Sequence, residues 1–188
     1  MTEKQKNAFN KIISTLPDDC RESYLEIAEY AISLGYMPVL TGKNEDAVNF
    51  SKSKTKRTIL RIKLPRQIAM SFYAFTEYKG VFKEALDGRY RGDNIGSETR
   101  RFDCENKCGQ CGYGAYGYGY SIPLPNGNYG FICGHCVLPL PIFSAENIQE
   151  VKEALKTQDE FYLKQITCAS AIMESRSSQI ISQSGFTA

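Results

Sequence analysis

The chain has 188 residues, 42% of them hydrophobic, and its 23 basic side chains nearly balance its 21 acidic ones. That length and apolar content suffice for one substantial core, or for one core with a small satellite module. The net charge of +2 excludes a general demand for a polyanionic partner, and no apolar run approaches the roughly eighteen residues that span a bilayer.

The start of the chain predicts two helices. A helix over residues 3–15 is indicated by apolar residues at helical spacing: Phe9, Ile12, Ile13 and Leu16. A second helix is expected over residues 19–34, with Asp18 or Asp19 as its N-terminal cap and Gly35 at its end. A third helix is expected over residues 77–90, after a set of extended segments at 38–41, 46–51, 57–64 and 67–75.

The middle of the chain is locally basic. Residues 43–101 carry fourteen basic and seven acidic side chains, and the densest run spans residues 52–66. Such a run can contact phosphate, on nucleic acid or on a metabolite. Within it, Arg61 and Lys63 alternate with apolar residues, as in a strand with one solvated and one buried face: Leu60, Ile62 and Leu64. A solvated strand face is the preferred interpretation, and an anion-binding surface is the alternative.

Four cysteines form two Cys-x-x-Cys pairs, Cys108 with Cys111 and Cys133 with Cys136. Twenty-one residues separate the pairs, one more than the upper end of the roughly fifteen to twenty found in zinc ribbons. Four thiolates fill the tetrahedral shell of a structural Zn²⁺. A rubredoxin-like iron site uses the same four sulfurs and is the alternative metal.

The other cysteines and the histidine bear on that assignment. Cys104 offers a third sulfur next to the first pair, but the glycines that follow Cys108 and Cys111 favour those two as ligands. Cys20 and Cys168 lie on expected helices, where a small thiol is usually a core residue. His135 is the only histidine, so one protomer cannot build a histidine dyad or a His-rich catalytic zinc site.

Disulfides and redox chemistry fit these cysteines less well than a metal. A thioredoxin-type dithiol needs a strand-to-helix junction, which neither pair has. Disulfides require an oxidising compartment, and the N-terminus lacks the apolar region of a signal peptide. We therefore expect reduced thiols in a cytoplasmic protein.

A tyrosine- and glycine-rich stretch lies between the two cysteine pairs. Tyr116, Tyr118 and Tyr120 alternate with small residues, which places the three rings on one face of a predicted strand. Asn126-Gly127 is a turn signal for a hairpin. The rings could stack on bases, sugars or an aromatic ligand. Packing of the small ribbon onto the rest of the protein is the preferred interpretation.

The end of the chain predicts a closing helix and a tail. Ser144 is expected to cap a helix with one apolar stripe: Ile148, Val151, Leu155, Tyr162 and Ile166. The Ser-rich end is expected to fray or to make only light surface contact. The predicted organisation is a core at residues 1–102, a zinc-ribbon-like insertion at 103–142, a closing helix at 143–168 and a tail at 169–188. The predicted fold class is α+β, an antiparallel sheet with helices packed on it and the hairpin inserted.

Two stretches resemble known families. The run from L-P-D-D-C-R-E through G-Y-M-P-V-L-T-G-K to R-T-I-L-R-I-K-L resembles the small bacterial YdhG-like domains, some of which are described as frataxin-like iron chaperones. Frataxin-like iron handling uses an acidic surface, whereas this segment is basic, so the resemblance implies a fold and not that function. The cysteine pairs followed by P-I-F-S-A-E-N-I-Q-E-V-K-E-A-L are similar to uncharacterised zinc-knuckle proteins of anaerobic bacteria, which imply no activity.

Three functions of different classes follow from these features. The preferred one is a non-enzymatic cytoplasmic binding domain with a structural zinc site and a small molecule or peptide as ligand. The second is nucleic-acid binding through the ribbon tyrosines and the basic run at 52–66. The third is an enzyme with Glu77 or Tyr73 as acid or base. It ranks last, because no motif in the sequence positions such groups. A membrane partner is not expected.

Overall fold

The computed structural model describes residues 1–42, 44–75, 78–90, 119–123, 129–133, 137–141 and 145–183. Its helical elements are α1 (Glu3–Thr15), α2 (Asp18–Ser33), α3 (Gly80–Tyr90), the 3₁₀ turn η2 (Ala145–Asn147) and α5 (Ile148–Gln183). Its strands are β1 (Met37–Thr41), β2 (Ala47–Lys52), β3 (Arg57–Lys63), β4 (Gln67–Met70), β5 (Gly119–Pro123), β6 (Tyr129–Cys133) and β7 (Leu138–Pro139).

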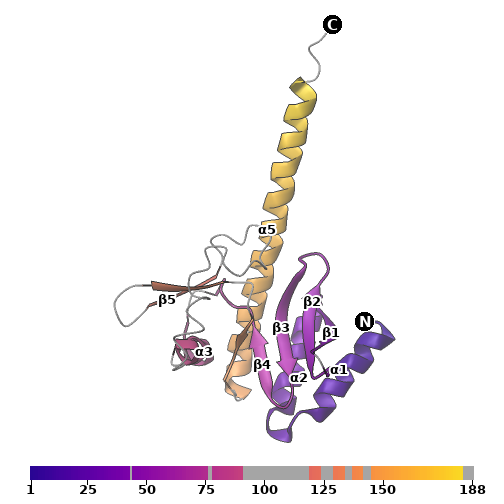
Figure 1. Ribbon diagram of the computed structural model, residues 1–188, viewed down its shortest axis with the longest axis vertical. Helices are drawn as coiled ribbons and strands as arrows, with labels where there is room; N and C mark the ends of the chain where they lie inside the picture. Colours follow the sequence, from indigo (N-terminus) through magenta and orange to yellow (C-terminus); the bar gives the residue numbers. More distant parts are fainter. Residues whose placement is uncertain are drawn as a thin grey trace.

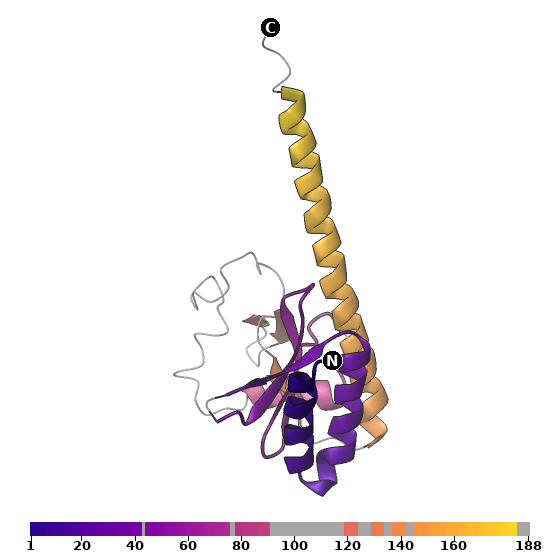
Figure 2. The ribbon, with the colours of Figure 1, turned by 90° about the vertical axis from the view of Figure 1, so that its right-hand side faces the viewer.

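The centre of the fold is a five-stranded antiparallel sheet in the order β1-β2-β3-β4-β7. Strands β5 and β6 form a separate two-stranded sheet. Helices α1, α2 and α5 lie side by side on one face of the large sheet (Figures 1 and 2). The predicted α+β class with an antiparallel sheet is confirmed.

The inner face of this sheet is built from apolar residues in register. One row crosses all five strands, and every side chain in it is buried: Pro38, Phe50, Leu60, Met70 and Leu138. The predicted stripe of α1 packs against this layer, and the rings of Phe9 and Phe50 meet edge-on with centroids 6.3 Å apart. Burying a side chain of this size contributes about 1.5–3 kcal/mol, so this row and the stripe of α1 contribute much of the stability of the fold.

Helices α1 and α2 are capped differently at their N-terminal ends. A reciprocal pair of hydrogen bonds between Thr2 and Gln5 starts α1. The prediction that Asp18 or Asp19 caps α2 is wrong, because Pro17 takes the cap position and both carboxylates lie in the first turn. There they favour the helix through its dipole.

Gly35 ends α2, as predicted. It adopts a left-handed φ of +90°, a conformation that a side chain would strain. The N–H of Tyr36 donates to the carbonyl of Ala31 at 3.1 Å, and the N–H of Gly35 donates to the carbonyl of Ile32 at 2.8 Å. This arrangement closes the helix and directs the chain into β1.

A β-bulge alters the middle of the sheet. The register between β2 and β3 shifts at Phe50 and Ser51, and Ile59 is the extra residue. Ile59 and Leu60 are therefore buried one after the other, where strict alternation predicts one exposed side chain. The predicted strand at 67–75 also ends early, at Met70, since the N–H of Phe72 donates to a side chain instead of a strand.

Both edges of the five-stranded sheet contain a proline. Pro38 lies in β1. Because proline has no N–H to donate to β2, its backbone nitrogen faces away from β2, toward the open edge of the sheet. Next to β7, the N–H of Leu140 donates to the carbonyl of Ile68 at 2.9 Å. Backbone groups of successive residues point in opposite directions, so the backbone nitrogen of Pro139 faces away from β4.

The last helix is longer than predicted. Helix α5 starts at Ile148 and runs for 36 residues to Gln183, projecting beyond the sheet (Figure 1). The predicted helix end at 168 is therefore wrong, and residues 169–183 are helical. The stretch 148–183 contains neither glycine nor proline, so no residue in it interrupts the helix. The expected cap Ser144 lies outside the described residues.

Candidate metal centre and tyrosine cluster

The β5–β6 hairpin defines where the two cysteine pairs can meet. Gly119 is opposite Cys133 at one end of the ladder, and Pro123 is opposite Tyr129 at the other. The chain therefore enters β5 and leaves β6 at the same end. Cys133 is the last residue of β6, and Cys111 precedes Gly119 by eight residues.

The other three expected ligands, Cys108, Cys111 and Cys136, lie outside the described residues, as do the neighbouring Cys104 and His135. Within the described part of the chain, no group of three or more His, Cys, Asp and Glu side chains is placed to hold a metal ion. Cys20 of α2 is buried and has no disulfide partner among these residues. The four-cysteine centre stays a prediction.

Tyr120 is the described member of the expected tyrosine stripe, since Tyr116 and Tyr118 fall outside the described residues. Its side chain is fully buried, and its hydroxyl accepts a hydrogen bond from the N–H of Phe72 at 3.0 Å. Its ring lies edge-on to those of Phe72 and Tyr73, with centroid distances of 4.8 and 5.7 Å. Burial raises the pKa of Tyr120 well above its ordinary value, so the phenol stays neutral.

Two more buried tyrosines, Tyr73 and Tyr162, extend this group toward α5. We call Tyr73, Tyr120 and Tyr162 the tyrosine cluster. The rings of Tyr73 and Tyr162 are 6.1 Å apart. Burial, and next the neighbouring Tyr162, raise the pKa of Tyr73, which makes it a poor general base near neutral pH. Glu77, the other acid or base considered from the sequence, lies outside the described residues.

A buried glutamine adjoins the tyrosine cluster. Gln158 of α5 is fully buried, and its Oε1 accepts a hydrogen bond from the N–H of Ala74 at 3.0 Å. This bond holds the chain after β4 against α5. Its Nε2 has no hydrogen-bond partner among the described residues.

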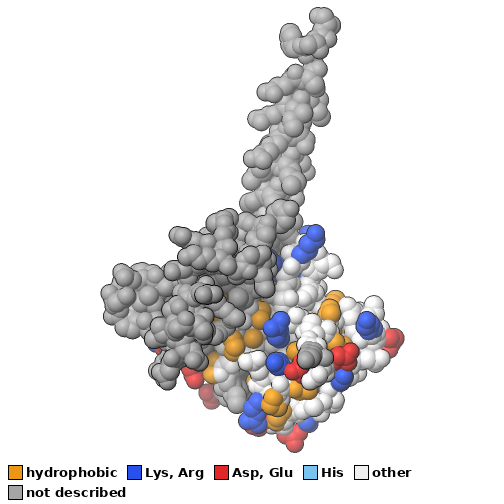
Figure 3. All heavy atoms as spheres, in the orientation of Figure 1, with side chains coloured by type: hydrophobic (Ala, Val, Ile, Leu, Met, Phe, Trp, Pro, Cys, Tyr) orange, Lys and Arg blue, Asp and Glu red, His pale blue; other side chains and the backbone are white. Residues whose placement is uncertain are grey.

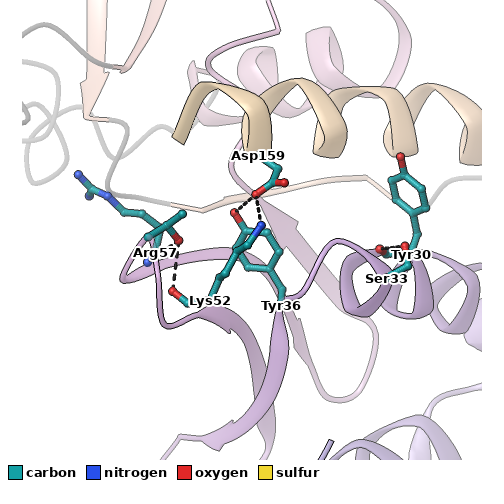
Figure 4. Close-up of polar contacts among 7 residues, drawn as sticks. Tyr30, Ser33, Tyr36, Lys52, Arg57 and Asp159 are labelled. Atoms are coloured by element: carbon teal, nitrogen blue, oxygen red, sulfur yellow. Dashed lines mark hydrogen bonds and ion pairs between the residues drawn. The ribbon is translucent and has the colours of Figure 1, made fainter. Parts of the chain in front are cut away.

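An ion pair joins α5 to the sheet next to this cluster (Figure 4). Oδ1 of Asp159 accepts hydrogen bonds from Nζ of Lys52 at 2.8 Å and from the hydroxyl of Tyr36 at 2.9 Å. The two charged side chains are only 17% and 9% exposed, Lys52 and Asp159 respectively. Burial raises the pKa of Tyr36, and the negative charge of Asp159 raises it further. Arg57 points away from Asp159 (Figure 4) and lies 6.0 Å from the ring centre of Tyr162.

Most cations of the basic run at 52–66 have partners within the chain. Besides Lys52, three of its cations have partners: Arg61 with Asn49 at 2.6 Å, Lys63 with Asp46 at 3.8 Å and Arg66 with Asp19 at 2.9 Å. Arg61 and Lys63 are exposed while Leu60 and Ile62 are buried, so the predicted strand face is confirmed. On the face shown in Figure 3, basic side chains stand among acidic and apolar ones.

Sequence reasoning missed the buried polar residues of α5. Gln158 and Asp159 follow Leu155 and precede Tyr162, so they fall inside the apolar stripe. Polar side chains at stripe positions are the signal that would have identified them. Lys52 gave no such signal, because it looks like any other lysine of the basic run.

Comparison of the chain with protein-family models, with curated proteins and with solved structures gives no match. Among the described residues, no helix combines the length and the apolar character needed to cross a membrane.

Proposed function

We propose that the chain is a non-enzymatic binding domain with a structural zinc site formed by Cys108, Cys111, Cys133 and Cys136. The observation that carries this proposal is the pairing of Gly119 with Cys133, by which β5 begins where β6 ends. Seven residues connect Cys111 to Gly119, and such a length reaches up to about 25 Å. The first cysteine pair is therefore within reach of the second.

The hairpin needs such a staple on physical grounds. A two-stranded hairpin alone is marginally stable in water, and among the residues that the structure describes β5–β6 shares no ladder with the large sheet. Binding free energy at four thiolates acts as folding free energy for a module of this size. Zinc fits a closed four-sulfur shell, and iron is the alternative metal.

Elemental analysis of the purified, reduced protein tests the metal site. We expect about one zinc per chain, because four thiolates fill one tetrahedral shell. Cys133→Ser should lose the metal, whereas Cys104→Ser, the matched control, should keep it. Equimolar iron would replace zinc with a rubredoxin-like centre. A metal-free reduced preparation would remove the basis of the proposal.

The ligand of the binding domain is a small molecule or a peptide. Nucleic acid is the less favoured alternative, since most cations of the basic run have intramolecular partners and nucleic-acid affinity depends on free phosphate contacts. Fluorescence anisotropy with single-stranded DNA, duplex DNA and RNA should show no submicromolar binding at physiological salt. Submicromolar binding that is lost in the Tyr116→Ala, Tyr118→Ala double variant would favour a nucleic-acid-binding ribbon.

A further inference from the structure

Tyr120 joins two sheets that share no ladder within the described part of the chain. Its strand, β5, pairs with β6 in the small sheet and with no other strand of the described residues. Its side chain nevertheless has no exposed surface and sits with the core of the large sheet. Figure 1 shows β5 lying away from the large sheet, on the side of α3. The hairpin therefore contributes a single described side chain to the core, much as a partner contributes an anchor residue to a pocket.

The surroundings of this ring are aromatic. The ring planes of Phe72 and Tyr73 are inclined at 65° and 82° to the ring plane of Tyr120, which is the edge-to-face geometry that aromatic pairs prefer. Phe82 of α3 backs Phe72 at a centroid distance of 4.7 Å, and Tyr78 lies 6.0 Å from it. We call this the aromatic cage: Phe72, Tyr73, Tyr78 and Phe82.

The polar contact of Tyr120 with the cage is made by the backbone N–H of Phe72. Strand β4 ends at Met70, so no strand partner accepts from this N–H, and the acceptor is the hydroxyl of Tyr120. A buried N–H left without an acceptor is strongly unfavourable. The site thus requires both a flat six-membered ring and an oxygen at one end of it.

We propose that the aromatic cage is a phenol-recognition site, which the chain fills from within by means of Tyr120. The class of ligand is a neutral para-substituted phenol, either a tyrosine side chain or a small free phenol. The Phe72 N–H donates a hydrogen bond to the hydroxyl of the ligand, and the surrounding aromatic side chains pack against its ring. The site uses no metal ligand, so it goes beyond the proposed zinc-binding function.

Chemical rescue tests this site in the full-length chain. Tyr120→Gly removes the side chain, and p-cresol, which has the same non-hydrogen atoms as the missing side chain, is the probe. We expect saturable binding of p-cresol by calorimetry and a rise in melting temperature, neither of which occurs in the wild type with its cage filled. Toluene has the same ring without the hydroxyl and should bind at least about tenfold more weakly, since it leaves the Phe72 N–H unpaired. If the folded Tyr120→Gly variant does not bind p-cresol, or binds toluene as tightly as p-cresol, the proposal is wrong.

A second variant covers the case in which Tyr120→Gly does not fold. Tyr120→Phe keeps the ring and removes only the acceptor, so hydrogen exchange at the Phe72 amide should accelerate. The Ser71 amide is the control, because it donates to the carbonyl of Ile59 at 2.9 Å and keeps that acceptor. Unchanged exchange at Phe72 would show that the cage does not read the hydroxyl. Zinc content measured on the same samples separates this result from any failure of the metal site.

Discussion

At the scale of single residues, the unusual feature is a charged pair inside the main core. Asp159 lies on the buried face of α5 and reaches Lys52 on β2, with Tyr36 as a second donor. Buried ion pairs contribute little net stability, but they are unfavourable in any arrangement that separates the partners. The pair therefore restricts α5 to the rotation and the height along its axis that bring Asp159 over β2.

Replacing one partner exposes that dependence. Lys52→Met should lower the free energy of unfolding by about 3 kcal/mol, because it leaves a buried carboxylate without its cation. Lys83→Met is the matched control at the exposed Lys83–Asp87 pair, and it should change stability by less than about 0.5 kcal/mol. Chemical denaturation of both variants gives the two values.

The double variant Lys52→Met, Asp159→Asn checks the cause. It removes the unpaired charge but keeps an acceptor for the Tyr36 hydroxyl, so it should recover part of the loss. A single Lys52→Met variant as stable as Lys83→Met would mean that the pair does not hold α5 in place.

At the scale of elements, the β5–β6 hairpin is the part of the fold with the weakest local support. It has its own two-stranded ladder, and Tyr120 anchors it against Phe72 and Tyr73, in the segment that follows β4. By linkage, the proposed metal at Cys133 would stabilise the anchoring of Tyr120 and be stabilised by it, because Gly119–Cys133 is the ladder pair next to Tyr120–Ile132.

Chelation of the metal should therefore loosen the hairpin first. Hydrogen exchange should accelerate at the amides of β5 and β6 and at Phe72, while the amides of β2 and β3 keep their protection, because their core does not depend on the hairpin. Uniform acceleration across the chain would instead make the hairpin an integral part of the main core. No change at all would mean that the metal does not stabilise the hairpin.

At the scale of the whole molecule, buried tyrosines make stability sensitive to alkali. Burial raises the pKa of Tyr24 from 10.0 to about 12, and it raises the pKa of Tyr36, Tyr73, Tyr120 and Tyr162 as well. A raised pKa favours the neutral phenol of the folded state. The resulting stability is complete below pH 10 and is lost as the pH rises through 10 toward the folded-state values.

Alkaline unfolding should consequently be cooperative. Each unit of raised pKa is equivalent to about 1.4 kcal/mol, and the shifts of these tyrosines all favour the neutral folded state, so their ionisation at high pH acts against the fold together. Near-ultraviolet absorbance should show exposed tyrosines ionising first, and the buried ones ionising together with the loss of circular dichroism. Independent titration of all 12 tyrosines near their ordinary pKa, with the fold retained, would contradict this.

Local sequence patterns predicted the elements whose signals are local. The periodicity of α1, the glycine that ends α2 and the alternation along β3 each depend on neighbouring residues, and the structure confirms them. Strand β7 has only two residues and pairs with a strand far earlier in the chain, so no local pattern marks it. The contact between Lys52 and Asp159 spans 107 residues. The bulge at Ile59 depends on how β2 and β3 align, which neither strand specifies alone.

The prolines at the two edges affect whether the sheet can pair with a strand of another copy of the protein. An added strand needs donors and acceptors that alternate along the edge, and Pro38 and Pro139 each remove a donor at an outward-facing position. Edge-to-edge growth, the first step toward fibrillar aggregates, is thus disfavoured on both sides of the five-stranded sheet. We therefore expect concentrated solutions to resist β-type aggregation through this sheet, and a peptide partner to dock on side chains instead of extending the ladder.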